Sequence, residues 1–547
     1  MPQDPKSNSL TPNIAKAGGI MAASIFLSRV LGIVREAVIS GKFGNGTLSD
    51  AYFAAFQIPD LLFYLVAGGA LSSAFIPVFS EYLHTDREDE AWHIFSSVAS
   101  IMALVVTAFI VVAMVFTPQL VHLTSPNYNP VHAAEFYANT AYMARIILPA
   151  QFAFFIGGIL FGTLYSKNVF SVPGLGPNIY NIGIIFGALV LSSFTALPTA
   201  GMTWGATIGA FLGNIVVPLI AMRAIGLKYK FSLDTKHPGV RKVFKLMAPV
   251  VFGLSLPGVF ALFLVTFSSM GYGDKSGYIS AFRQANTLMQ APLGVFGQSL
   301  ALAAFPALSQ FFAQKRMDMF SDQLIKTLRS VIYLTVPISA ILIFCPTDVI
   351  RVVYEHGKFT PTDTARMAPL LTGFAIGVPF WCLQPVLMRA FFAIQNTLRP
   401  ILLGTLATGI FLALSFAVVK THQAPFMLSL GGSIAAIVLV TMLIFAIRKE
   451  LPDTDIRPLV TTFGKSALAS IASTGVFWGI FRIVDQIGLG ANKYANLAVA
   501  LFFGICVMWI YYFITKALKM PETAYLDRVT KKLNRSKSPE PTEPTQE

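Results

Sequence analysis

Four arginines stand inside stretches of the chain that are otherwise apolar enough to cross a membrane. They are Arg29, Arg35, Arg145 and Arg283. An arginine at the centre of a bilayer costs about 2.5–3.5 kcal/mol on insertion scales, so four that faced lipid would cost on the order of 10 kcal/mol. We therefore expect these side chains to line a water-filled cavity or to be paired. Because guanidinium groups bind phosphate oxygens in bidentate fashion, such a cavity would suit a diphosphate.

Residues around the first two arginines extend this candidate site. Arg29 and Glu36 are seven residues apart, which places them on nearly the same face of a helix. Gly32 lies between them, where the missing side chain would allow close packing or the approach of a ligand. Glu36 and Asp50 are expected near the outer end of this region. There they would balance the charge of the arginines or bind a coupling cation.

The composition places these residues in a membrane protein. The chain has 547 residues, of which 55% are hydrophobic and 12% are charged, whereas a soluble domain has about 25% charged residues. About fourteen apolar stretches approach the 20 residues that a membrane-spanning helix needs. The predicted fold is therefore all-α and polytopic. The predicted spans are residues 18–39, 53–79, 93–116, 138–164, 177–196, 201–223, 246–270, 278–311, 327–346, 367–394, 400–419, 425–447, 463–484 and 494–515.

The distribution of Lys and Arg predicts that both termini lie in the cytoplasm. With the N-terminus inside, 28 of the 40 basic residues fall in inside segments and 8 fall outside. Cytoplasmic loops of membrane proteins carry such an excess. The net charge of +14 therefore does not call for nucleic acid as a partner.

A weak internal repeat suggests two related halves. AYFAAF (51–56) precedes AFIPVFS (74–80) much as GYISAF (277–282) precedes AAFPALS (303–309). Repeats of this kind are typical of transporters that bind their substrate between the halves. The predicted organisation is a cytoplasmic N-terminus (1–17), an N-lobe of helices 1–6 (18–224), a basic linker (225–245), a C-lobe of helices 7–12 (246–447), helices 13 and 14 (448–516), and a basic and disordered cytoplasmic tail (517–547).

Helix 7 of this scheme carries two prolines, Pro249 and Pro257. Proline inside a helix removes a backbone hydrogen bond and bends the helix. The bend would be either a static kink or a hinge for a gating motion.

The chain lacks motifs that would indicate catalysis or a bound metal. Its seven histidines show no HExxH or other close metal spacing. Gly464-Lys465-Ser466 ends like a phosphate-binding loop, but no glycine stands five residues before Gly464. We therefore expect a transporter without a cofactor and not an enzyme. An ion-coupled exporter of small molecules and a membrane-embedded transferase are the alternatives from other functional classes.

Eight motifs in order, over about residues 20–450, resemble those of the MurJ/MviN family of lipid II flippases. The first is Ser28-Arg29-x-x-Gly32-x-x-Arg35-Glu36. The others are Phe43-Gly44-x-Gly46 with Asp50-Ala51, IPDLL (58–62), GALSSAFIPVFSEY (69–82), GLGPNIYN (174–181), LMQAPLGVFG (288–297), YEHGKFTPTDT (354–364) and NTLRP (396–400).

The resemblance implies the fold of the MOP superfamily, in which two six-helix lobes enclose a cationic cavity and helices 13 and 14 form a groove for a lipid tail. It implies flipping of lipid II, the undecaprenyl-diphosphate-linked peptidoglycan precursor, to the outer leaflet of the bacterial inner membrane by alternating access. The driving force would be the membrane potential or a coupling cation, Na+ or H+. The implied partners are this lipid, membrane lipids and the cell-wall synthesis machinery.

The chain departs from the family at several charged positions. They are Phe63, Tyr64, Gly68, Asn286, Thr287 and Asn396. Family members usually carry arginine near the first two and at the Thr287 position, and an acid at the other three. Arg283 lies four residues before Thr287, on the same helical face, and we expect it to supply the missing charge. The nearest alternative function is that of a divergent paralogue moving another polyprenyl-diphosphate-linked saccharide.

Overall fold

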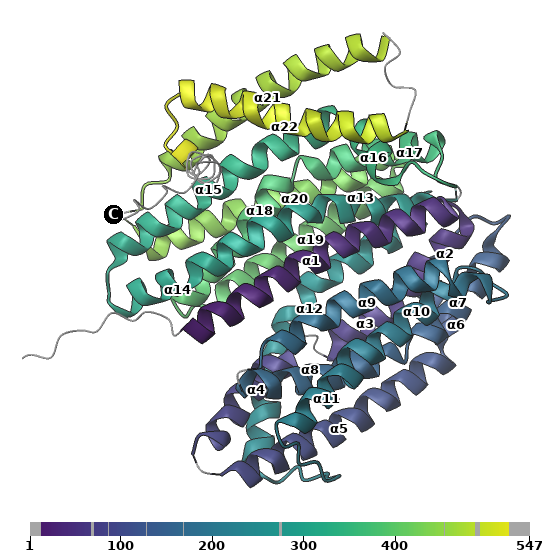
Figure 1. The fold of residues 1–547 in the computed structure, drawn as a ribbon, viewed down its shortest axis with the longest axis vertical. Coiled ribbons are helices and arrows are strands. Elements are labelled where there is room, and N and C mark those ends of the chain that lie inside the picture. The colour runs from purple at the N-terminus through teal and green to yellow at the C-terminus, as the bar shows by residue number, and fades with distance from the viewer. Residues whose placement is uncertain are drawn as a thin grey trace, which may run out of the picture. The chain divides into compact units, whose positions relative to one another are not determined.

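The computed structural model of the chain is helical over most of the described residues of every predicted span (Figure 1). The structure describes residues 12–66, 70–85, 87–126, 128–167, 169–272, 276–452, 454–486 and 493–524. No strand is present among these residues. The predicted all-α fold is thus confirmed, whereas the predicted tail falls mostly outside the described residues, which end at 524.

Within the described residues, the first half of the chain forms eleven α-helices, one 3-10 turn and one π-helical turn. They are α1 (Pro12–Phe43), α2 (Thr47–Ala55), α3 (Gln57–Val66), α4 (Ala70–Leu83), α5 (Glu88–Val115), α6 (Thr117–Thr124), α7 (Ala133–Ile147), α8 (Ala150–Ser166), α9 (Ser171–Leu189), the 3-10 turn η1 (Leu191–Ser193), α10 (Ala200–Phe211), the π-helical turn η2 (Leu212–Val216) and α11 (Val217–Ala224).

Within the described residues, the second half follows with eleven further α-helices and one π-helical turn. They are α12 (Pro238–Tyr272), α13 (Tyr278–Pro292), the π-helical turn η3 (Leu293–Gln298), α14 (Ser299–Ala313), α15 (Met317–Phe344), α16 (Pro346–Tyr354), α17 (Pro361–Ala375), α18 (Val378–Ala393), α19 (Leu398–Lys420), α20 (Pro425–Glu450), α21 (Arg457–Gln486) and α22 (Lys493–Ala517). Helix α12 includes Pro249 and Pro257, whose side chains lie outside the described part, so their hinge role stays a prediction.

Eight helical segments among the described residues are long and apolar enough to cross a membrane, or nine if α17 and α18, bent by 43°, form one span. The count of fourteen stays a prediction. The second predicted span, residues 53–79, is not one helix but is divided among α2, α3 and α4. Pro59 explains the first break, because proline has no backbone N–H to donate to the carbonyl of Ala55, four residues earlier, and it suits the first turn of a new helix.

The chain divides into two compact units. The first contains Met1–Gly294, Val353–Phe374 and Pro400–Ala435, and the second contains Val295–Val352, Ala375–Arg399 and Ala436–Glu547. These units do not coincide with the predicted lobes, and the lobe division stays a prediction. All four arginines singled out above belong to the first unit.

Helix α9 packs closely against both α1 and α10 in the first unit. On one side, Asn178 Nδ2 donates hydrogen bonds to the carbonyl and the hydroxyl of Ser24 in α1, at 3.3 and 3.1 Å. On the other side, a Cβ atom on Gly205 would lie 2.2 Å from the carbonyl oxygen of Gly183, so only glycine permits this approach. Glycine therefore permits the close packing of α10 on α9, and the hydrogen bonds from Asn178 join α9 to the helix that carries Arg29 and Arg35.

The basic linker before α12 lies along the start of α5. Ser232 Oγ accepts a hydrogen bond from Ser97 at 2.9 Å, and Lys228 pairs with Asp89 at 2.7 Å. His93 contacts the carboxylate of Asp234 at 3.1 Å. The hydrogen bond from His93, together with backbone amides, holds the pKa of Asp234 below its ordinary value.

Candidate functional site

Two cavities in the first unit share part of their walls. The larger has a volume of about 620 Å³ and the smaller about 260 Å³. Arg35, Asp60 and Arg283 line both of them. Together they fall within the size range of small-molecule sites, roughly 300–1,000 Å³. The larger cavity is formed mainly by α1, α9 and α13, and the smaller one by α1, α2, α3, α8 and α9.

Three of the four predicted arginines meet in these cavities. Arg29, Arg35 and Arg283 line the larger one, although Arg283 is more than 240 residues away from the others in sequence. The exposed side chain of Arg29 lies against Gly294, since a Cβ atom there would be 2.8 Å from Arg29 Nε. No acidic partner of Arg29 is found in the described part of the chain. Its guanidinium is therefore available to a ligand.

Arg35 is held in place from two sides. Its Nη2 donates to Glu36 Oε1 at 2.5 Å, and its Nη1 donates to Asn181 Oδ1 at 3.0 Å. Asn181, which lies in α9, also donates to the carbonyl oxygen of Ser28 in α1 at 3.3 Å. Glu36 is buried, and its Oε2 receives no hydrogen bond from the described residues. Glu36 thus forms an ion pair with Arg35, and its predicted role in charge balance or coupling stays a prediction.

Arg283 faces an acid that the sequence analysis did not single out. Its Nη2 lies 4.0 Å from Oδ2 of Asp60, in the first turn of α3. Thr287 also lines the larger cavity, and its hydroxyl donates to the carbonyl oxygen of Arg283 at 3.0 Å. Asp60 is the one charged residue of the predicted span 53–79. The insertion cost that drew attention to the arginines applies to acids as well, and it would have identified Asp60.

Of two other predicted site residues, Gly32 lies at the larger cavity and Arg145 lies outside both cavities. Gly32 lines the larger cavity, and a Cβ atom there would meet nothing within 4 Å, so this glycine borders open space and is not a close packing contact. Arg145 was expected in the cavity but lines neither one. Its exposed side chain donates from Nε to the carbonyl oxygen of Met114 at 3.3 Å. Carbonyls in the last turn of a helix, here α5, lack partners within that helix.

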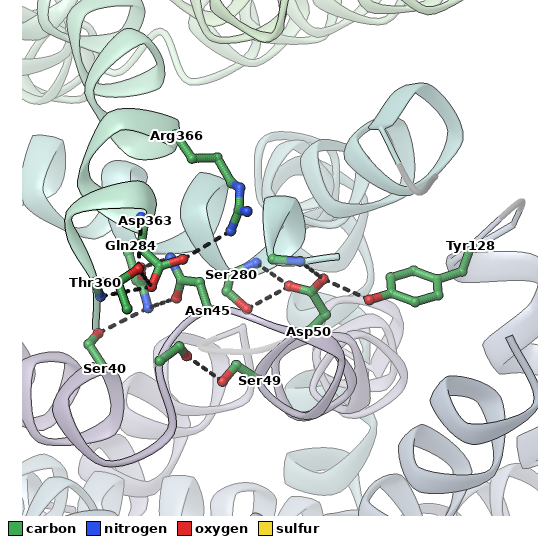
Figure 2. Close-up of polar contacts among 12 residues, drawn as sticks. Ser40, Asn45, Ser49, Asp50, Tyr128, Ser280, Gln284, Thr360, Asp363 and Arg366 are labelled. Atoms are coloured by element: carbon green, nitrogen blue, oxygen red, sulfur yellow. Dashed lines mark hydrogen bonds and ion pairs between the residues drawn. The ribbon is translucent and has the colours of Figure 1, made fainter. Parts of the chain in front are cut away.

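Within the described residues Asp50 is not paired with Arg29, Arg35, Arg145 or Arg283, and its predicted role in charge balance or coupling stays a prediction. Figure 2 shows its carboxylate pointing at the start of α13. It accepts four hydrogen bonds: from the Tyr128 hydroxyl (2.9 Å), the Gly277 amide (2.6 Å), and the amide and hydroxyl of Ser280 (2.8 and 2.6 Å). An acid at a helix N-terminus satisfies amides that lack helical partners. Asp50 is therefore a structural acceptor.

A second cluster of polar side chains adjoins Asp50 (Figure 2). Gln284 of α13 donates to Ser40 Oγ at 3.0 Å and to Asn45 Oδ1 at 2.9 Å, and it accepts from Asn45 Nδ2 at 3.0 Å. Gly44 has a φ of +66°, and a Cβ atom on it would lie 2.7 Å from the carbonyl oxygen of Lys358. Residues of the motifs at 43–50 and 354–364 therefore lie together here, where they form hydrogen bonds and close backbone contacts.

Comparisons with known proteins match most of the chain. The family model described as "Lipid II flippase MurJ" matches residues 39–491. A "Probable lipid II flippase MurJ" of Vibrio cholerae serotype O1 is 26% identical over 525 residues, which cover 91% of this chain and 97% of that protein. A solved structure of "Lipid II flippase MurJ, inward closed conformation" has a TM-score of 0.75 at 24% identity, and covers 91% of this chain and 98% of that one.

A more distant solved structure shares the fold. It is an "Inward-facing conformation of a multidrug resistance MATE family transporter of the MOP superfamily", with a TM-score of 0.62 at 12% identity. It covers 80% of this chain and 99% of that one. The fold of the chain is thus the one shared by MurJ and MATE transporters, as the sequence resemblance implied.

Proposed function

The chain belongs to the MurJ family, and we propose that it flips lipid II, the undecaprenyl-diphosphate-linked peptidoglycan precursor, from the cytoplasmic to the outer leaflet of the bacterial inner membrane. It acts as a transporter and not as an enzyme. Alternating access exposes the cavity first to one side of the membrane and then to the other.

The meeting of Arg29, Arg35 and Arg283 at one cavity is the observation that carries this proposal. A diphosphate offers several anionic oxygens, and a guanidinium binds two of them at once through its planar fork of N–H groups. Arg29 has its donors free of acidic partners in the described residues, whereas Arg35 is oriented by Glu36 and Asn181. The two therefore serve different purposes: Arg29 recruits the diphosphate and Arg35 presents a fixed charge.

The driving force is part of the same proposal. The membrane potential or a coupling cation, Na+ or H+, supplies it. Asp50 is unsuited to a coupling role, because four protein groups already donate hydrogen bonds to its carboxylate. The better candidate is Glu36, whose buried Oε2 receives no hydrogen bond from the described residues.

Growth rescue tests the proposed substrate. Cells depleted of their own lipid II flippase would receive this chain, and both growth and the amount of lipid II on the outer face of the membrane would be measured. We expect both to be restored. A chain that inserts into the membrane but restores neither would contradict the proposal. In that case, transport of another polyprenyl-diphosphate-linked saccharide in vesicles would favour the divergent paralogue.

The proposed orientation places both termini in the cytoplasm, and cysteine labelling tests it. In a background without Cys345, Cys382 and Cys506, the Val131→Cys variant should react with a membrane-impermeant maleimide added to intact cells. The Lys236→Cys variant should react only after the cells are opened. Both side chains are exposed, so access to the reagent depends on the side of the membrane. Labelling of the Lys236→Cys variant in intact cells would contradict this orientation.

A further inference from the structure

Asp60 has no role in the transport cycle described so far. Its carboxylate lines both cavities, and its side chain is 34% exposed. Within the described residues, its one ionic contact is with Arg283, and no hydrogen bond reaches its oxygens. An acid placed in a cavity built for an anion needs an explanation, because it opposes the binding of that anion.

The contact between Asp60 and Arg283 is loose. The 4.0 Å between Nη2 and Oδ2 exceeds the range of a hydrogen bond, so charge alone holds the pair. By contrast, Arg35 and Glu36 are joined by a hydrogen bond of 2.5 Å. An ion pair between partly exposed side chains with no hydrogen bond contributes little and exchanges easily. The N–H donors of Arg283 make no hydrogen bond to other described residues, so they remain free for another acceptor.

The three arginines that line the cavities differ in the partners that each of them contacts. Arg35 is committed to Glu36 and Asn181, and Arg29 has no acid beside it in the described part of the chain. Arg283 alone is shared between the protein and any anion that enters. The Asp60 carboxylate would repel a diphosphate bound beside it. Asp60 and the diphosphate therefore compete for the guanidinium of Arg283.

We infer that Asp60 is a displaceable counter-ion of Arg283. It holds the guanidinium while the cavity is empty, yields it to the diphosphate when the lipid binds, and takes it back when the lipid leaves. Asp60 thereby lowers the affinity of the cavity for the anionic head group and speeds its release, as a transporter requires. The inference rests on the proposed function, since it concerns the same diphosphate.

Binding of undecaprenyl diphosphate to the full-length protein in lipid nanodiscs tests this role. The Asp60→Asn variant removes the charge at nearly constant size, and the Asp60→Glu variant is its matched control because it keeps the charge. We expect Asp60→Asn to bind about threefold to tenfold more tightly, mainly through slower dissociation. Asp60→Glu should stay close to the wild type. The Asp60→Ser variant, which is neutral and smaller, should change affinity in the same direction as Asp60→Asn.

A double-mutant cycle with Arg283→Gln separates competition from a general charge effect. If Asp60 acts through Arg283, then Asp60→Asn should change affinity by less than about twofold in the Arg283→Gln background. Equal tightening in both backgrounds, or unchanged affinity of Asp60→Asn and Asp60→Ser in the wild-type background, would overturn the counter-ion role alone. A wild-type protein that binds neither undecaprenyl diphosphate nor lipid II would overturn the proposed function itself, and the counter-ion role with it.

Discussion

Asp50 and Asp60 lie on neighbouring short helices, α2 and α3, and the protein uses the two carboxylates in opposite ways. Asp50 is fully buried and accepts four hydrogen bonds at 2.6–2.9 Å. Asp60 is one-third exposed and has a single ionic contact at 4.0 Å. The first carboxylate closes a network that extends to α13, whereas the second faces open cavity.

The difference shows how the role of a charged side chain inside an apolar helical protein can be inferred from its hydrogen bonds. A charged group whose hydrogen-bonding capacity is filled by protein atoms holds helices together. A charged group left with free donors or acceptors at a cavity is ready to exchange partners. The arginines also differ in place: Arg145 is exposed, lies outside both cavities and donates to the Met114 carbonyl, whereas Arg29 lines the larger cavity with no acid beside it in the described residues.

The largest effect on transport is expected at Arg29. The Arg29→Ala variant should lower lipid II flipping by more than about tenfold, because it removes charge-assisted hydrogen bonds to the diphosphate. Arg29→Lys should keep part of the activity, since lysine supplies the charge without the planar fork. Thermal unfolding should be unchanged in both variants.

Arg145→Ala is the matched control for Arg29→Ala. Its side chain is exposed and lines neither cavity, so transport should remain near the wild-type rate. Wild-type flipping by Arg29→Ala, or a loss in Arg145→Ala as large as that in Arg29→Ala, would break the distinction between the two arginines.

The largest effect on stability is expected at Asp50. The Asp50→Ala variant leaves the Gly277 and Ser280 amides without their acceptor, and each buried unsatisfied group costs about 1–3 kcal/mol. We therefore expect the free energy of unfolding to fall by roughly 2–6 kcal/mol, measured as a lower Tm in detergent. Asp60→Ala should leave the Tm nearly unchanged. Equal decreases in Tm in the two variants would contradict the structural role that the hydrogen bonds assign to Asp50 and not to Asp60.

A smaller effect on transport is expected at Arg283, because Asp60 already offsets part of its charge. The Arg283→Ala variant should lower flipping about fivefold to tenfold. Adding Thr287→Arg should restore a measurable part, since both positions line the larger cavity one helical turn apart. If Arg283→Ala transports normally, the cavity does not need this charge, and a substrate less anionic than lipid II would be favoured.

Much of the fold follows from the sequence for a simple reason. Backbone groups in a bilayer must be satisfied within their own helix, so each apolar run of sufficient length predicts a helix without knowledge of its neighbours. The same local logic identified Arg29, Arg35 and Arg283 by their cost, and it placed Gly32 near the first two. Two predicted spans are broken: Pro59 begins a new helix within 53–79, and the span 367–394 bends between α17 and α18.

The sequence by itself determined which residues are too costly to face lipid, because that cost depends only on residue type and on the hydropathy of the surrounding segment. Only the tertiary structure decided what each of them contacts. Asp50 meets the start of α13 more than 220 residues away, Arg145 meets the end of α5, and Asp60 meets Arg283 across the cavity. The physical reason is that hydrogen bonds and ion pairs are short, so the role of a charge depends on which atoms the packing of distant helices brings within about 4 Å of it.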